Sequence, residues 1–259
     1  MTGLLLFSCN SYQKLLNSKE NPPKLKAAQK YYDNGEYRRA NRLYEQIIPA
    51  YRGKPQAQRI IYFFANTHYQ LGNYYLAAYQ FESFVKSFPK SEKLDEANFM
   101  IAKCYYMLSP IYSLDQENTN QAIEKLQIFI DNYPKSSYLS EANSFISELQ
   151  VKLEKKDFEI SKQYHTIRDY KAAISSLDNF ISNFPGTPFR ENALYYKFIS
   201  QYEIATNSVP NKKLLRLEGA KETYSAILRY YPETLFMEDI LEKIEDINEQ
   251  IEAINKTNT

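Results

Sequence analysis

The sequence predicts an all-α protein, an α-solenoid of about five helix pairs closed by a C-terminal capping helix. Three observations lead to this prediction. The 259 residues include only 6 Gly, too few for the tight turns of β-rich or dinucleotide-binding folds. One spacing of small, large and aromatic residues recurs five times, and it is the spacing of a single helix face. Four of the five copies run into a proline, which ends a helix.

The first nine residues resemble the end of a bacterial lipoprotein signal peptide. An apolar run over residues 4–7 leads through Ser8 to Cys9, the order of a lipobox. In that motif the cysteine thiol takes a diacylglycerol and becomes the first residue of the mature chain. The run is short and no Lys or Arg precedes it. We therefore expect that the true start of the protein lies upstream of Met1 or was trimmed. Residues 1–9 are predicted as a signal-peptide remnant and 10–23 as a polar tether; the alternative is an incidental cysteine.

The recurring unit begins at an alanine, with large residues at offsets 4 and 7 and an aromatic at offset 11. Tight turns centred on Gly35 and Gly72 precede the first two copies, and Arg168-Asp169 repeats the turn without glycine. This is similar to the tetratricopeptide (TPR) pattern, whose ideal period is about 34 residues. Ser or Thr two residues past each proline is predicted to cap the next helix. The alanines are Ala40, Ala77, Ala122, Ala173 and Ala220, the prolines Pro89, Pro134, Pro185 and Pro232, and the caps Ser91, Ser136, Thr187 and Thr234.

The alanines stand 37, 45, 51 and 47 residues apart, so the repeats carry insertions, predicted at 109–118 and 206–214. The widest step contains no Gly or Pro from 135 to 183, which predicts one long helix over 138–166. We assign 24–238 to the repeats and 239–259 to the capping helix and tail. Isoleucines spaced 4, 3, 4 and 3 in this tail favour a helix that caps the solenoid. A helix that docks to a partner is the alternative.

Composition argues against catalysis. The formal net charge is +1, so no overall field attracts nucleic acid. Two Cys and two His leave almost no scope for a Zn or iron–sulfur site, and we expect no metal and no cofactor. Cys104 is interpreted as a small buried hydrophobe, and His68 and His165 as packing or surface residues.

A lipid anchor followed by about five elongated repeats resembles the BamD family, TPR lipoproteins of the outer-membrane β-barrel assembly machine. The resemblance is carried by residues 9–16, 88–91 and 153–173. It implies a non-catalytic lipoprotein of the outer membrane, anchored by its lipid to the membrane surface and facing the periplasm. The implied partners are the periplasmic domains of a BamA-like barrel insertase and unfolded outer-membrane β-barrel proteins.

In TPR arrays the first helix of each pair lines a concave groove. Counting back from Gly72 places Arg59 on this side, and the same count places Gln29 there in the first repeat. Tyrosines offer large contact area at low entropic cost, and an amide or ammonium could hold a peptide backbone or carboxylate. The alternative is that these aromatics pack between neighbouring repeats. The predicted groove residues are Tyr32, Tyr62, Asn66, Tyr69, Lys103 and Tyr106, with Ile61, Phe64, Ala65 and His68 expected to form the core of the same helix as Tyr62.

Two further functions remain open at this point. One is a TPR lipoprotein adaptor for another cell-envelope complex, which differs from the first interpretation only in its partner. The other is a helical accessory domain of a cell-wall lytic enzyme, which lacks any catalytic segment within the 259 residues.

Overall fold

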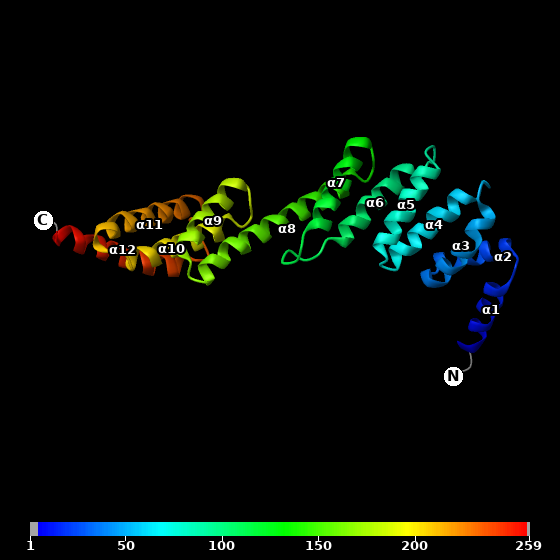
Figure 1. Ribbon diagram of the computed structural model, residues 1–259, viewed down its shortest axis with the longest axis horizontal. Coiled ribbons are helices and arrows are strands. Elements are labelled where there is room, and N and C mark those ends of the chain that lie inside the picture. Colours follow the sequence, from blue (N-terminus) through cyan, green and yellow to red (C-terminus); the bar gives the residue numbers. More distant parts are fainter. Residues whose placement is uncertain (1–4, 258–259) are drawn as a thin grey trace. The chain divides into compact units, whose positions relative to one another are not determined.

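A computed structural model describes residues 5–257, and these form twelve helices (Figure 1). The chain divides into two compact units, Met1–Leu149 and Gln150–Thr259, and α8 (Leu139–Thr166) runs across their boundary. The first unit contains α1 (Leu5–Asn17), α2 (Asn21–Asp33), α3 (Tyr37–Tyr51), α4 (Ala57–Gln70), α5 (Tyr74–Ser87), α6 (Leu94–Leu108) and α7 (Glu117–Asn132). The second contains α9 (Tyr170–Asn183), α10 (Arg190–Thr206), α11 (Pro210–Tyr230) and α12 (Met237–Thr257).

Helices within each unit stack in chain order. From α2 to α7 each helix packs against the next, and α2 also contacts α4 (Figure 1). In the second unit α9, α10, α11 and α12 follow the same order, and α10 contacts α12 as well. A helix that touches both its successor and the one after it belongs to a stack of helix pairs. This confirms the predicted all-α solenoid, with α2, α4 and α6 as the first helices of their pairs.

The recurring alanines lie in the hydrophobic core of the stack. All five are fully buried, and so are most of the large residues at offsets 4 and 7, such as Tyr44 and Phe81. Each such large side chain contributes about 1.5–3 kcal/mol of hydrophobic stabilisation. Ala77, predicted to sit at a helix crossing, is 0% exposed. The spacing read from the sequence therefore identified the core face of α3, α5, α7, α9 and α11.

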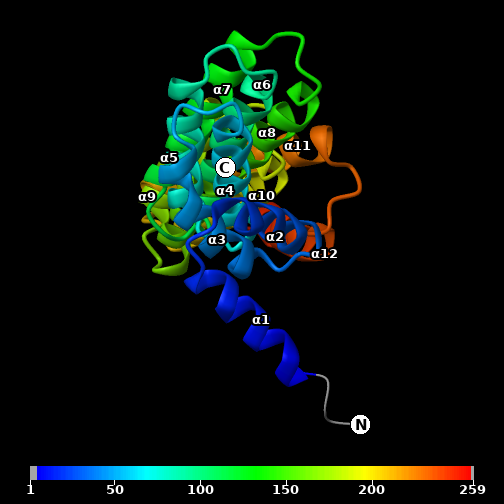
Figure 2. The same ribbon diagram turned by 90° about the vertical axis from the view of Figure 1, so that its right-hand side faces the viewer.

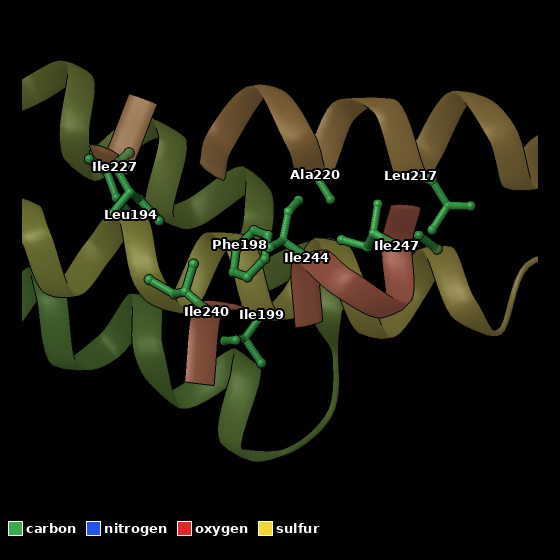
Figure 3. Close-up of a cluster of buried hydrophobic side chains, with 10 residues drawn as sticks. Leu194, Phe198, Ile199, Leu217, Ala220, Ile227, Ile240, Ile244 and Ile247 are labelled. Atoms are coloured by element: carbon green, nitrogen blue, oxygen red, sulfur yellow. The ribbon is translucent and has the colours of Figure 1, made fainter. Parts of the chain in front are cut away.

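The C-terminal helix covers the end of the last pair. Ile240, Ile244 and Ile247 of α12 are buried against α10 and α11, where they meet Phe198 and Leu217 (Figure 3). Further along, Ile251 and Ile254 pack partly on the same cluster. The isoleucine spacing thus places an apolar stripe over the last helix pair.

Three turns between paired helices share one backbone arrangement. At the α4–α5 turn Gly72 has φ +77°, its N–H donates to the Tyr69 carbonyl at 3.0 Å, and the Asn73 N–H donates to the His68 carbonyl at 2.9 Å. The α2–α3 turn repeats this with Gly35, at φ +76°. At the α8–α9 turn the same position is held by Arg168, at φ +64°. A left-handed residue closes each helix, and only the third turn places a side chain there.

Substitutions at the left-handed residue of two of these turns should change the free energy of unfolding in opposite directions. Gly72→Val should destabilise by about 1–2 kcal/mol because a β-carbon strains a left-handed backbone. Open space surrounds the added β-carbon, so the backbone alone accounts for the loss. Arg168→Gly should stabilise by up to about 1 kcal/mol, since relief of the same strain exceeds the entropy cost of glycine. Chemical denaturation measures both, and a stabilised Gly72→Val would contradict the shared turn.

Three details differ from the sequence prediction. Ser91, Ser136, Thr187 and Thr234 do not cap helices; each hydroxyl instead accepts from the backbone N–H two residues later, in a turn that precedes the helix. The insertion expected at 206–214 is mostly helical, because α11 begins at Pro210 with the proline in its first turn. The insertion at 109–118 does form the long α6–α7 connection.

The segment predicted as a polar tether, residues 10–23, also differs. Residues 10–17 continue α1, and α2 begins at Asn21. Tyr12, Leu15 and Leu16 pack against buried residues of α2, α3 and α4, because their spacing places them on one helix face. The buried Lys24 ammonium also donates to the Leu16 carbonyl at 3.0 Å and to Gln46 Oε1 at 2.7 Å. These contacts hold α1 against α2 and α3.

Candidate functional site

The six predicted groove residues lie on α2, α4 and α6, all in the first unit. Tyr32 on α2 donates from its hydroxyl to Asn66 Oδ1 on α4 at 2.9 Å. Its ring meets Phe63 edge-on, with 4.7 Å between ring centroids. Burial raises the pKa of Tyr32 to about 12, so the phenol stays protonated and remains a donor. This pair joins the first helices of two neighbouring repeats.

Tyr62 is not a free groove residue, and this part of the prediction is wrong. Its side chain is 5% exposed and packs between Phe81 and Phe84 of α5, with ring centroids 5.7 and 5.5 Å away. Its hydroxyl has no hydrogen-bond partner among the described residues. Burial raises the Tyr62 pKa, and the carboxylate of Glu96 adds to that shift.

Of the four residues predicted to form the core of α4, two are buried. Phe64 and Ala65 are buried as expected, but Ile61 and His68 are only half-buried. Helix α4 packs against α3 on one side and α5 on the other, so side chains over a wide arc of its circumference are buried. Tyr69 lies at the border of that arc, half-buried and edge-on to Tyr74 at 5.4 Å. Burial raises the Tyr69 pKa to about 12.

Lys103 and Tyr106 connect α6 to the N-terminal part of α8. The Lys103 ammonium pairs with Glu141 at 2.7 Å and lies over the rings of Phe99 and Phe145, 5.5 and 5.7 Å from their centroids. Tyr106 stacks on Phe145 at 3.9 Å and donates to Glu148 Oε2 at 2.6 Å. That hydrogen bond, with burial, raises the Tyr106 pKa to about 12. Both polar groups are therefore already engaged within the protein.

These contacts belong to a repeated pattern that the sequence analysis did not recognise. In several first helices a tyrosine hydroxyl donates to a side chain of the next first helix; we call this set the tyrosine ladder. Its pairs in the first unit are Tyr32–Asn66 and Tyr106–Glu148, and in the second unit Tyr195–Asp239 at 3.0 Å and Tyr202–Asp246 at 2.9 Å. The matching seven-residue steps of Tyr195 to Tyr202 and Asp239 to Asp246 were the available signal.

An open cleft of about 1050 Å³ lies between α2 and the start of α4. Its apolar lining comes from Leu25, Tyr51 and Ile60, the last two being buried. The Arg59 guanidinium donates to Gln29 Oε1 at 3.1 Å and lies 5.5 Å from the Phe63 ring centroid. The sequence placed these two polar residues on the groove side but did not predict the cleft. Its charged lining residues are Lys26, Lys30, Arg59 and Asp33, all exposed.

The His and Cys side chains that the structure describes are poorly placed for metal binding or nucleophilic catalysis. Residues 5–257 contain no cluster of three His, Cys, Asp or Glu side chains placed to hold a metal. Cys104 is fully buried, and burial raises its pKa to about 12, which suppresses the thiolate. Burial lowers the pKa values of both His68 and His165. Cys104 therefore behaves as the small buried hydrophobe that was predicted.

A comparison with protein families matches YfiO, described as an outer membrane lipoprotein, over residues 22–214 and 163–255. The chain belongs to the YfiO family. Membership confirms the resemblance to BamD-type TPR lipoproteins, and it supports an outer-membrane lipoprotein of the assembly type. In the part of this YfiO-family chain that the structure describes, no helix is long and apolar enough to span a membrane.

A comparison with solved structures matches TPR proteins at low sequence identity. The TPR2AB domain of yeast Sti1, in its complex with pHSP90, is 14% identical and covers 88% of this YfiO-family chain and 98% of its own, with a TM-score of 0.43. A thermophilic TPR protein of Thermus thermophilus is 16% identical, covers 88% of this chain and 98% of its own, and has a TM-score of 0.34. No curated protein matches the chain.

Proposed function

We propose that this protein is a non-catalytic lipoprotein, acylated at Cys9 and held at the periplasmic face of the outer membrane. In this role it scaffolds the β-barrel assembly complex through the periplasmic domains of a BamA-like insertase, and it binds unfolded outer-membrane β-barrel proteins. Family membership supports the first part. The observation that supports substrate binding is the open cleft between α2 and α4.

The chemistry of the cleft suits the C-terminal end of an extended chain. Leu25, Tyr51 and Ile60 offer an apolar surface for a large terminal side chain. The exposed ammonium groups of Lys26 and Lys30, four residues apart on one face of α2, can pair with a terminal carboxylate. The predicted groove residues Tyr32, Asn66 and Tyr69 remain proposed contacts for the chain beyond this end.

A peptide from the C-terminus of a barrel protein tests the cleft. Lys26→Gln with Lys30→Gln should weaken binding roughly 2- to 30-fold, because each exposed ion pair contributes about 0.2–1 kcal/mol. Lys90→Gln with Lys135→Gln removes equal charge from exposed turns outside the cleft and should leave affinity unchanged. A C-terminally amidated peptide should bind the wild-type protein weakly and respond little to the cleft substitutions. Equal affinity of both double variants would move the site elsewhere.

The assembly partner is tested separately. Purification of the membrane-anchored protein should recover the barrel insertase. Reproducible absence of the insertase, with other envelope proteins recovered instead, would favour the alternative of an adaptor for a different cell-envelope complex.

A further inference from the structure

Charge is distributed unevenly along the chain. The first 60 residues contain eleven Lys and Arg against four Asp and Glu, whereas the remaining 199 contain 21 against 27. The near-neutral total therefore hides a basic N-terminal part with a net charge of +7. This part consists of α1 and the first helix pair, together with the start of α4.

Two of these cations lie near Tyr12, which follows Cys9 on α1. Tyr12, one turn after Cys9 on α1 and about 4.5 Å along the helix axis, donates from its hydroxyl to the Arg39 carbonyl at 3.3 Å. The Arg39 guanidinium lies 5.4 Å from the Tyr12 ring centroid, and the charge of Arg42 also acts on the Tyr12 phenol. The beginning of α3 thus contacts α1 at Tyr12, one helical turn after Cys9. In both views α1 projects from the first helix pair with its N-terminal end outermost (Figures 1 and 2).

Arg38 and Arg42 are available to an external anion. Both are exposed, and they stand four residues apart on one face of α3. Arg39 pairs with Glu36, but neither Arg38 nor Arg42 forms an ion pair with another described residue. A shallow hollow of about 390 Å³ lies beside Arg38, lined also by Gly35, Glu36, Tyr37 and Arg39.

We propose that the start of α3 rests on an anionic phospholipid surface, with Arg38 and Arg42 against lipid phosphate groups. Acylation of Cys9, proposed above, would bring this end of the first unit to the bilayer. Each Lys or Arg near an anionic bilayer raises the affinity of the protein for that bilayer roughly fivefold. This attraction fades within a Debye length of about 8 Å at physiological salt. Acyl chains combined with a basic patch give firmer attachment than the chains alone.

Vesicle co-sedimentation tests the contribution of Arg38 and Arg42 in the absence of the acyl anchor. The protein used is the unacylated mature chain, from residue 9 onward with Cys9→Ser. The chain should bind phosphatidylcholine vesicles containing phosphatidylglycerol, bind pure phosphatidylcholine vesicles far less, and dissociate as salt is raised. Arg38→Gln with Arg42→Gln should reduce binding to the anionic vesicles about thirtyfold.

The matched control is Arg52→Gln with Lys54→Gln. These exposed cations follow the C-terminal end of α3, and Arg52 lies about 15 Å beyond Arg42 along the axis, so the control should retain most binding. Unchanged circular dichroism spectra would show that both variants are folded. Equal binding to the two vesicle types, or an equal loss in the two double variants, would overturn the proposal. Because no acyl chain, peptide or insertase is present, such a failure is separate from a failure of the proposed function.

Discussion

Tyr62→Ala is expected to destabilise the first unit by about 3–5 kcal/mol, the usual cost of removing a buried aromatic ring. The ring is 5% exposed and makes edge contacts with Phe63, Phe81 and Phe84, so its loss leaves a cavity between α4 and α5. Tyr62→Phe should be nearly neutral or stabilising, because the hydroxyl that it removes has no partner among the described residues. Chemical denaturation followed by circular dichroism measures both changes.

Tyr79→Ala provides the matched control for this prediction. The same substitution at a 65% exposed position on α5 should change stability by no more than about 0.5 kcal/mol. An unchanged midpoint for Tyr62→Ala would contradict the packing of α4. The result also affects binding studies: a variant that combines Tyr62→Ala with Tyr69→Ala would lose affinity through unfolding. Tyr69→Ala alone is the better probe of the proposed groove.

Cys9→Ala, expressed behind a complete lipoprotein signal, is expected to abolish palmitate labelling and release the protein into the soluble fraction. Each buried methylene of an acyl chain contributes about 0.8 kcal/mol of membrane binding, so loss of all chains removes the anchor. The basic patch at the start of α3 should leave only weak, salt-sensitive attachment.

Cys104→Ala is the control for labelling, since it removes the other cysteine. That thiol is buried in α6 and protonated at neutral pH, so its removal should leave labelling and fractionation unchanged. Labelling that persists in Cys9→Ala would defeat the proposed acylation. Labelling that disappears in Cys104→Ala would do the same.

The second helices of the pairs could be predicted from sequence because each buries a single face. Small, large and aromatic residues at fixed offsets describe such a face completely, and Ala77, Phe81 and Phe84 are all buried as expected. The long α8 followed from the absence of Gly and Pro. The left-handed turns at Gly35 and Gly72 followed from their glycines, but the same backbone at Arg168 has no such signal.

The candidate site was harder to predict because first helices bury more than one face. On α4 both Ile60 and Tyr62 are buried, although they lie on different sides of the helix, so periodicity could not show which aromatic was free. The cleft depends on how Leu25, Tyr51 and Ile60 from three segments meet. Its volume is set by the packing of α2 against α4, and no motif in the sequence describes such a space.

The tyrosine ladder has a consequence for how the stack comes apart. In a repeat protein the free energy divides into the intrinsic stability of each repeat and the coupling between neighbours. Each ladder hydrogen bond belongs to the coupling, because its donor and acceptor lie on successive first helices. Loss of the acceptors Asp239 and Asp246 would therefore weaken the cooperativity between α12 and the pair beneath it. The last helix would then open and close on its own while the pair it covers stays folded.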